Sequence, residues 1–213
     1  MRRNGRRHAG SDDYRVTIHS IQIRGKTMQI NVNYLKAAAV AVGKEETRYY
    51  LKGVAIQANQ KGVFIVATDG HRLAAFRQAP ELENLTECSI IIPIETINAL
   101  KTREETVELG KINGAQYMLG NLIFEPIDGT FPEWRRIIPK ETSGEIAQFN
   151  AAYMADWAKM TKALGKKDAK IIISHNGDSP ALVHFGLPDI DGFGVIMPFR
   201  AHNVPTGAPA WAL

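Results

Sequence analysis

The chain has 213 residues, of which 45% are hydrophobic and 23% are charged. This length and mixture suit one large or two small globular domains and exclude a disordered, collagen-like or coiled-coil chain. The formal net charge of +4 equals the contribution of four arginines at the N-terminus, because the remaining 22 basic residues match the 22 acidic ones. The bulk charge therefore does not indicate what the folded part binds. Those arginines are Arg2, Arg3, Arg6 and Arg7.

A single cysteine, Cys88, excludes an internal disulfide and a cluster of metal-binding cysteines, and it favours a reducing, cytoplasmic compartment. The apolar runs are far shorter than the roughly 20 residues that span a bilayer. No apolar segment follows the arginines, so they do not form a secretory signal. Residues 1–13 are predicted to form a flexible basic arm, with contact to phosphate groups as the alternative, and residues 14–27 are predicted to form short strands.

From Met28 onward the sequence predicts the same unit three times, a short strand, an amphipathic helix and then further strands. The first unit, 28–77, is predicted to contain a helix with Asn33 as its N-cap. The second unit, 89–139, is predicted to contain a short helix at 94–102. The predicted strands of these two units are 29–32, 49–57, 63–67, 73–77, 89–92, 106–112, 115–119 and 122–126.

The third unit, 145–200, is predicted to contain a helix at 151–164 with Asn150 as its N-cap, and strands at 146–149, 170–174, 181–185 and 194–198. One face of this helix is apolar, and Lys159, Lys162 and Lys166 gather on the opposite face. Such a face is compatible with plain solvation, and the alternative is contact with a phosphate backbone without sequence readout. The pattern of units predicts an α+β repeat assembly.

Three ordered motifs resemble one protein family, the bacterial sliding clamps, which are the beta subunits of DNA polymerase III. Two are similar to the middle domain of a clamp, and the third is similar to the residues with which clamps end. They are Arg48-Tyr49-Tyr50-Leu51-Lys52-Gly53 with Val66-Ala67-Thr68-Asp69-Gly70-His71-Arg72-Leu73-Ala74, then Asp128-Gly129-Thr130-Phe131-Pro132-Glu133-Trp134-Arg135-Arg136-Ile137-Ile138-Pro139, and Val195-Ile196-Met197-Pro198-Phe199-Arg200.

The resemblance implies an α+β DNA-clamp fold with helices on one face of antiparallel sheets, built from about three units where a whole clamp has six. Residues 28–140 resemble a complete middle domain, and residues 141–200 resemble only the second half of the last domain. The first domain and the opening half of the third are missing from this correspondence. Since clamps close head to tail through those parts, ring formation by this chain is an open question. Twelve units in a ring would require four chains.

The resemblance also implies a groove that receives short linear peptides from polymerases and other replication proteins, with a wall from each side. Aliphatic side chains could bury an apolar anchor, and arginines could bind the peptide backbone or a carboxylate. From the residues alone, a tight turn at Asp69-Gly70 beside a core of aliphatics is the alternative. The matching positions are Leu51, Thr68, Gly70, His71, Arg72, Leu73, Pro132, Arg136 and Ile137 on one side, and Val195, Met197, Pro198, Phe199 and Arg200 on the other.

Residues 201–213 form a tail beyond the point where clamps normally end. It contains two prolines and is predicted to lack regular structure. Because it leaves the chain beside the proposed groove, one hypothesis is that Trp211 and Leu213 occupy that groove in the same or a neighbouring subunit. A loose end is the alternative.

The sequence does not predict an enzyme. Asp69 and His71 could serve acid-base chemistry, but no nucleophile is tied to them by a motif. His175 and His184 have no third metal ligand at a recognisable spacing, and phosphate-binding or dinucleotide-binding glycine motifs are missing. We therefore expect a non-catalytic accessory subunit of a DNA polymerase, with no cofactor and no metal.

The function expected from the resemblance is that of a replication processivity factor that binds duplex DNA nonspecifically and docks partner proteins through peptides. A homo-oligomer is among the expected assemblies. The alternative is a clamp-related adaptor or competitor that binds the same peptides without encircling DNA. The candidate DNA contacts are Lys36, Lys101, Arg103, Lys159, Lys162 and Lys166.

Overall fold

The computed structural model describes residues 27–79, 87–167, 169–200 and 207–212. The basic arm predicted at 1–13 and the strands predicted before residue 27 lie outside the described residues. No helix in the described ranges is both long and apolar enough to cross a membrane.

The described residues form the predicted succession of three units, each with one α-helix. The first contains β1 (Met28–Asn31), α1 (Val32–Ala39), the 3-10 helix η1 (Glu46–Leu51), β2 (Gly53–Asn59), β3 (Gly62–Thr68) and β4 (Arg72–Gln78). The second contains β5 (Cys88–Pro93), α2 (Ile94–Ala99), β6 (Thr106–Asn113), β7 (Gln116–Leu119) and β8 (Leu122–Phe124), followed by the 3-10 helix η2 (Trp134–Ile137). The third contains α3 (Ala151–Ala163), β9 (Ile172–Ser174), β10 (Ala181–His184) and β11 (Gly192–Ile196), and the 3-10 helix η3 (Ala210–Ala212) lies in the tail.

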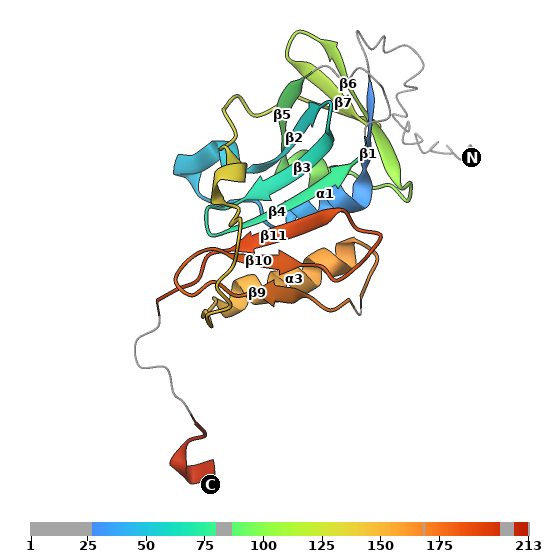
Figure 1. Cartoon of the computed structure of the whole chain (residues 1–213). Helices are drawn as coiled ribbons and strands as arrows, with labels where there is room; N and C mark the ends of the chain where they lie inside the picture. Colours follow the sequence, from blue (N-terminus) through green and yellow to red (C-terminus); the bar gives the residue numbers. More distant parts are fainter. Residues whose placement is uncertain (1–26, 80–86, 168, 201–206, 213) are drawn as a thin grey trace, which may run out of the picture.

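The strands form two antiparallel sheets, one of four strands in the order β1-β6-β7-β8 and one of seven in the order β5-β2-β3-β4-β11-β10-β9. The first two units exchange their opening strands, because β1 pairs with β6 and β5 pairs with β2. The third unit joins the first through β4 and β11, where Leu73 lies opposite Val195 (Figure 1). One continuous sheet therefore connects parts of the chain that are distant in sequence.

The helices and the sheets enclose the larger hydrophobic core. Helix α1 contacts both α2 and α3, so the helices form a row with α1 in the middle. Trp157 and Met160 of α3 are fully buried in this core, where Phe185 lies between Trp157 and Phe76. The arrangement confirms the α+β fold predicted from the sequence.

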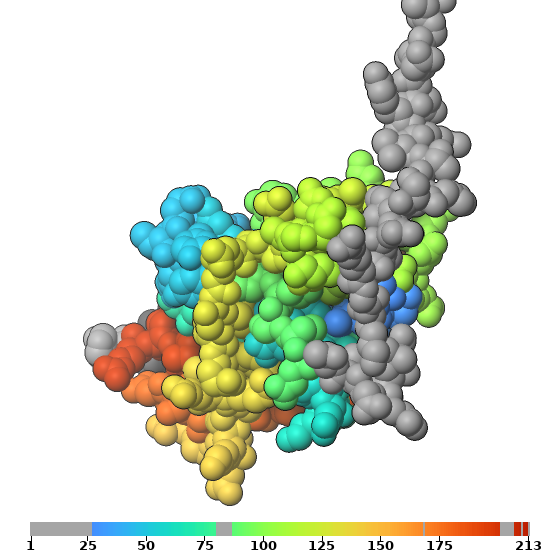
Figure 2. Space-filling model, turned by 90° about the horizontal axis from the view of Figure 1, so that it is seen from above, coloured from blue at the N-terminus to red at the C-terminus, as the bar shows by residue number. Residues whose placement is uncertain are grey.

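A second apolar cluster covers the opposite face of the seven-stranded sheet. Phe131 and Trp134, from the segment that follows β8, pack there on Leu73 and Val195. The Trp134 indole N–H donates a hydrogen bond to Gln57 Oε1 on β2 at 3.0 Å, which fixes the segment to the sheet. Figure 2 shows this part of the chain, in yellow, as a continuous band on the surface.

Three local predictions differ from the structure. The first helix begins two residues early, because the Asn31 side chain, and not that of Asn33, caps it by accepting a hydrogen bond from Tyr34 N at 2.9 Å. Residues 46–51 form η1 and not the start of a strand, since this turn buries Leu51 in the second cluster while Tyr49 stays 52% exposed. Helix α2 stops at Ala99, because Leu100 adopts an extended backbone and is buried.

The third unit follows its prediction at the helix and departs from it at the opening strand. Asn150 caps α3 by accepting a hydrogen bond from Ala152 N at 2.8 Å, as predicted. The expected strand at 146–149 makes only one isolated bridge, between Gln148 and Phe199. A strand needs a neighbouring strand, and none of the described residues supplies one there.

Candidate functional site

A pocket of about 300 Å³ lies between the first unit and α3. One wall comes from the loop after α1, from η1 and from the turn before β4, and the other comes from the first turns of α3. Three residues predicted for the peptide groove, Leu51, His71 and Arg72, line it. The complete lining is Val42, Gly43, Lys44, Glu45, Arg48, Leu51, Asp69, His71, Arg72, Ala152, Tyr153 and Asp156.

The turn between β3 and β4 is held by its own side chains. Asp69 Oδ1 accepts hydrogen bonds from the backbone N–H groups of His71 at 2.8 Å and Arg72 at 2.9 Å. Thr68 Oγ1 donates to the Arg72 carbonyl at 2.7 Å and accepts from Gly70 N at 3.0 Å. Gly70 has a φ of 90°, and a Cβ atom there would lie 2.5 Å from Arg48 Nη1. The turn therefore requires glycine at this position.

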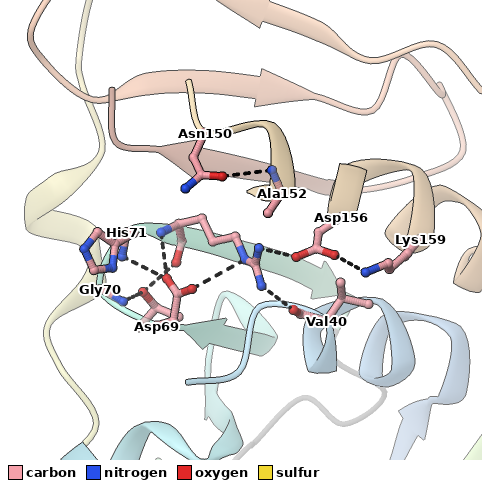
Figure 3. A network of polar contacts seen from close by, with 10 residues as sticks. Val40, Asp69, Gly70, His71, Asn150, Ala152, Asp156 and Lys159 are labelled. Carbon is pink, nitrogen blue, oxygen red and sulfur yellow. Dashed lines mark hydrogen bonds and ion pairs between the residues drawn. The ribbon is translucent and has the colours of Figure 1, made fainter. Parts of the chain in front are cut away.

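Arg72 is the centre of the polar network in this pocket. Its side chain is only 7% exposed, and its guanidinium forms an ion pair with Asp156 of α3. Arg72 Nη2 also donates to the Val40 carbonyl at 2.9 Å, and Arg72 Nε lies 3.7 Å from Asp69 Oδ2. Figure 3 shows Asp69, Val40 and Asp156 around this group, with Lys159 bonded to the far side of Asp156. The charge of Arg72 is thus neutralised inside the protein.

Tyr153 of α3 covers the mouth of this network. The Arg72 guanidinium carbon lies 4.7 Å from the centre of the Tyr153 ring, and the His71 ring stacks on the same tyrosine with 5.8 Å between centres. Burial and the neighbouring Asp69 carboxylate raise the pKa of Tyr153 above its usual value. The phenol therefore stays neutral at physiological pH and can act as a hydrogen-bond donor at the pocket.

The structure divides the predicted groove residues into a buried and an exposed group. Leu51, Thr68, Arg72, Leu73 and Val195 are buried, and of these only Leu51 and Arg72 line the pocket. Met197 lies beside the β3–β4 turn, because its backbone N–H donates to the His71 carbonyl at 2.8 Å. Pro198 is half-buried. The exposed positions are Gly70, His71, Pro132, Arg136, Ile137, Met197, Phe199 and Arg200.

The sequence reasoning missed Tyr153 and Asp156, which complete the pocket. A signal for Asp156 does exist, because it lies beside Trp157 on the buried side of α3, and a buried acid predicts a basic partner. Trp211 is 88% exposed, so it does not occupy the groove of its own chain, and Leu213 lies outside the described residues. Occupation of a neighbouring subunit's groove stays a hypothesis.

The candidate DNA contacts lie on or just after the helices. Lys159 pairs with Asp156 at 2.6 Å, and Lys166, beyond the end of α3, pairs with Asp189 at 2.9 Å. Lys162 is exposed on α3, Lys36 is half-buried on α1, and Lys101 and Arg103 are exposed after α2. Within the described ranges, none of these last four has an acidic side chain at ion-pair distance.

The side chains considered for catalysis have structural partners. Asp69 accepts two backbone N–H groups, His175 Nδ1 accepts a hydrogen bond from Ala147 N at 3.1 Å, and His184 Nε2 lies 3.3 Å from Ser174 Oγ. In the part of the chain that the structure describes, no group of three His, Cys, Asp or Glu side chains could hold a metal ion.

Comparison with known proteins places this geometry in a family. The family model described as DNA polymerase III beta subunit, central domain, matches residues 22–133. The beta sliding clamps of Haemophilus influenzae and Escherichia coli are each 32% identical, over 116 and 114 residues. These matches cover 51% and 50% of this chain but only 31% of each relative, so the chain matches less than a third of their length.

Solved structures extend the likeness of fold beyond the central domain. The polymerase sliding clamp from Bacillus subtilis has a TM-score of 0.67 and 20% identity, covering 86% of this chain and 67% of that one. The DNA polymerase III subunit beta from Pseudomonas aeruginosa has a TM-score of 0.66 and 20% identity, covering 83% and 67%. Such coverage includes the third unit, so the clamp fold predicted from the sequence is confirmed. The chain belongs to the family of bacterial sliding clamps, the beta subunits of DNA polymerase III.

Proposed function

We propose that this chain is a non-catalytic accessory factor of DNA replication in the cytoplasm, which docks partner proteins through a peptide groove and contacts duplex DNA through its helices. Membership of the family supports the general role in replication, whereas the groove and the DNA contacts are proposed for this chain. The observation that carries it is the pairing of β4 with β11. This pairing brings Met197, from the motif that resembles the end of a clamp, to the His71 carbonyl in the central-domain motif.

The chemistry of the exposed groove residues supports a peptide as ligand. Ile137, Met197 and Phe199 are 40%, 37% and 51% exposed and offer apolar contact area. Buried apolar anchors supply most of the affinity in interfaces of this kind. Arg136 and Arg200 are exposed, with Arg200 Nε 3.7 Å from Asp178 Oδ2 in an exposed pair, and both can bind a carboxylate or a backbone carbonyl. Arg72 is occupied by Asp156, so we assign it the role of holding the turn and not of contacting the ligand.

The row of helices supports nonspecific contact with DNA. Lys36, Lys162, Lys101 and Arg103 come from all three helical regions, and Lys159 adds a side chain that is 68% exposed although paired. Phosphate contacts of this type carry no sequence information and weaken with salt. They suit a protein that moves along a duplex.

The domain organisation that we propose is a complete central domain at 28–140 and a half domain at 141–200. The lengths of the structural matches support it. Since 107 residues make up only 29% of the curated Pseudomonas relative, that clamp is much longer than this chain. The match to the Pseudomonas structure spans 67% of that longer protein and 83% of this shorter chain, so it spans more residues in the clamp than it does here. A segment within the matched span of the clamp has no counterpart here.

The incomplete third unit favours a second candidate function, that of an adaptor or competitor that binds clamp-partner peptides without encircling DNA. A ring needs closed interfaces at both ends of the chain, and the opening strand of the third unit makes only the bridge between Gln148 and Phe199. Peptide binding is common to both candidates. Topological retention on DNA separates them.

A retention assay tests the choice between them. The protein is mixed with nicked circular plasmid, at a salt concentration that removes nonspecific contacts, and separated by gel filtration before and after the plasmid is linearised. A sliding factor stays with the circle and is lost from the linear form. Equal behaviour on both forms supports the adaptor.

Peptide docking is tested by fluorescence anisotropy, with a labelled peptide that carries two adjacent large apolar residues and a control peptide in which both are alanine. Preference for the apolar peptide is the expected result. Failure to bind either peptide would contradict both candidates.

A further inference from the structure

The first two units complete each other by exchanging opening strands, and the register of this exchange is the same in both directions. In each unit, the residue just before the helix N-cap lies opposite a residue of the other unit. That residue is the second one of the other unit's first long strand. These pairs are Ile30 with Val107 and Ile92 with Val54. All four side chains are at most 4% exposed and belong to the larger core.

The third unit has both parts of this arrangement but no second half to exchange with. Phe149 precedes the N-cap Asn150, and Ile173 is the second residue of β9. Both side chains face the larger core, as their counterparts do, yet both are only partly buried. Strand β9 is the last strand of its sheet and pairs, among the described residues, only with β10. In the part of the chain that the structure describes, its outer edge therefore has no strand beside it and can accept one.

The opening segment, residues 146–149, is already oriented for pairing. Phe199 N donates to the Gln148 carbonyl at 2.9 Å, just as Ile127 N donates to the Ile91 carbonyl at 3.0 Å in the second unit. In that unit β5 makes this contact on one edge and pairs with β2 on the other. In the third unit the corresponding second edge faces residues 175–177 of the same chain. Ala147 N donates to His175 Nδ1, and just before it Gly144 N donates to the His175 carbonyl and Gly177 N to the Glu145 carbonyl. An exchange of residues 146–149 therefore releases Ala147 from His175 and leaves Glu145 with its own chain.

Exposed isoleucines mark the two open edges. Ile146, at the start of the opening segment, is 78% exposed, and Ile172, the first residue of β9, is 58% exposed. Two large apolar side chains at the unpaired edges of one unit are expected of an interaction surface. The surface is also self-complementary, since the same unit presents an extended segment and a strand edge that both have no neighbouring strand among the described residues. A two-fold interface needs this property.

We propose that two copies of this chain form a dimer by exchanging the opening segments of their third units. Residues 146–149 of each copy pair antiparallel with β9 of the other, with Phe149 of one copy opposite Ile173 of its partner. Each seven-stranded sheet gains an eighth strand, and the two α3 helices lie side by side, as α1 and α2 already do. The dimer rebuilds across a two-fold axis the domain that each chain contains only in half, and it depends on neither DNA nor peptide binding.

The register allows a direct test by disulfide cross-linking. Gln148 of one copy and Ser174 of the other correspond to Ile91 and Ala55, which lie opposite each other in the β5–β2 pair. The Ile91 carbonyl points away from β2, toward Ile127, so this is a non-hydrogen-bonded pair, whose short separation suits a disulfide. Full-length Gln148→Cys and Ser174→Cys variants, each also carrying Cys88→Ser, are mixed and oxidised. The expected product is a covalent dimer that contains one chain of each kind.

The cross-linking needs a control for random collision. Mixing Gln148→Cys with Lys111→Cys, whose cysteine would lie on β6 in the other sheet, measures the background. Because each chain carries one cysteine, a fold in which the opening segment stays with its own chain cannot yield the mixed product. Yields equal to the background would overturn the proposal.

Light scattering after gel filtration tests the same surface without cysteines. We expect the unmodified chain to reach twice 23.6 kDa as concentration rises. Ile172→Lys, which adds a charge to the open edge, should weaken the dimer at least about tenfold. Ile123→Lys is the matched control, because Ile123 is 54% exposed on β8, the edge of the other sheet, and should leave the dimer intact.

Two results of that experiment contradict the exchange. A chain that is monomeric at every concentration up to its solubility limit would show that β9 takes no second copy. Loss of the dimer in Ile123→Lys but not in Ile172→Lys would place the contact at β8.

Discussion

Arg72 of β4 and Asp156 of α3 form a buried ion pair between residues 84 positions apart in the chain. Both side chains are nearly inaccessible, with 7% and 12% exposed. The pair joins the third unit to the first at the floor of the proposed groove. Groove geometry and the attachment of the third unit therefore depend on the same two residues.

Removal of one partner of this pair should destabilise the protein strongly. Asp156→Ala leaves the Arg72 charge buried without its counterion, and the free energy of unfolding should fall by about 3–5 kcal/mol. Replacing both, by Arg72→Met with Asp156→Leu, should cost much less, because no charge remains buried. Urea denaturation of the two variants measures the difference. Asp189→Ala is the control, since its pair with Lys166 is exposed to solvent and its loss should hardly move the urea midpoint.

Met197 should act in peptide binding without a role in stability. It is 37% exposed beside the β3–β4 turn, so Met197→Ala removes contact area from the groove and leaves the core intact. We expect the affinity for the apolar peptide to fall about fivefold or more, with an unchanged urea midpoint. Anisotropy titrations measure the affinity. The control, Ile123→Ala, removes a comparably exposed side chain from β8, and an equal loss there would argue against the groove.

Lys162 should contribute to the salt dependence of DNA binding. If it contacts one phosphate, Lys162→Ala should reduce the slope of log affinity against log salt by about 0.9. Lys61, exposed in the turn between β2 and β3, lies away from the helices, and Lys61→Ala should leave the slope unchanged. Titration of a short duplex at several salt concentrations provides both slopes. Identical slopes for the unmodified chain and Lys162→Ala would remove this residue from the interface.

Gly194 on β11 should not tolerate a side chain. A Cβ atom there would lie 2.4 Å from Trp157 Cη2, and Trp157 is fully buried. Gly194→Ala should therefore lower the free energy of unfolding by about 1–3 kcal/mol, because the tryptophan must move. Gly207→Ala is the matched control, since no atom lies within 4 Å of its added Cβ. Thermal denaturation distinguishes the two variants.

The Cys88 thiol should react slowly with alkylating reagents. Burial raises its pKa above the usual value. The thiolate is the reactive form, so at any pH near 8 a raised pKa leaves a smaller fraction of it. The alkylation rate should lie below that of a free cysteine at the same pH and should keep rising at pH values where the free thiol has levelled off. A rate equal to that of free cysteine would show that Cys88 is more accessible than its place at the start of β5 implies.

Local signals in the sequence predicted the elements whose structure depends on neighbours in the chain. Asn150 is followed by a long helical stripe, and it caps α3 as expected. The same kind of reasoning gave a wrong prediction for residues 46–51, because contacts with residues that are distant in the sequence set their conformation. Tyr50 lies against Gly129, where a Cβ atom would come within 2.8 Å, and no pattern near Tyr50 reports this contact.

The candidate site was predicted in part for a similar reason. His71 and Arg72 stand in a motif that resembles clamps, so their position beside a pocket followed from the resemblance. Tyr153 and Asp156 belong to the pocket because β4 pairs with β11, and that register is a property of the folded chain. Pocket side chains that come from a different unit are difficult to predict when this long-range strand pairing is not known.

The pairing of β4 with β11 also has a consequence for synthesis of the protein. The ribosome completes Gln78, the last residue of β4, long before it reaches Gly192, the first residue of β11. During that interval one edge of β4 has no partner strand, although the hairpins before and after it can form. Long-range strand pairing is slow, and an unpaired edge invites association with other chains. The nascent chain thus passes through a stage in which β5, β2, β3 and β4 of the seven-stranded sheet have been made but β11 has not. Misassembly would begin at this stage.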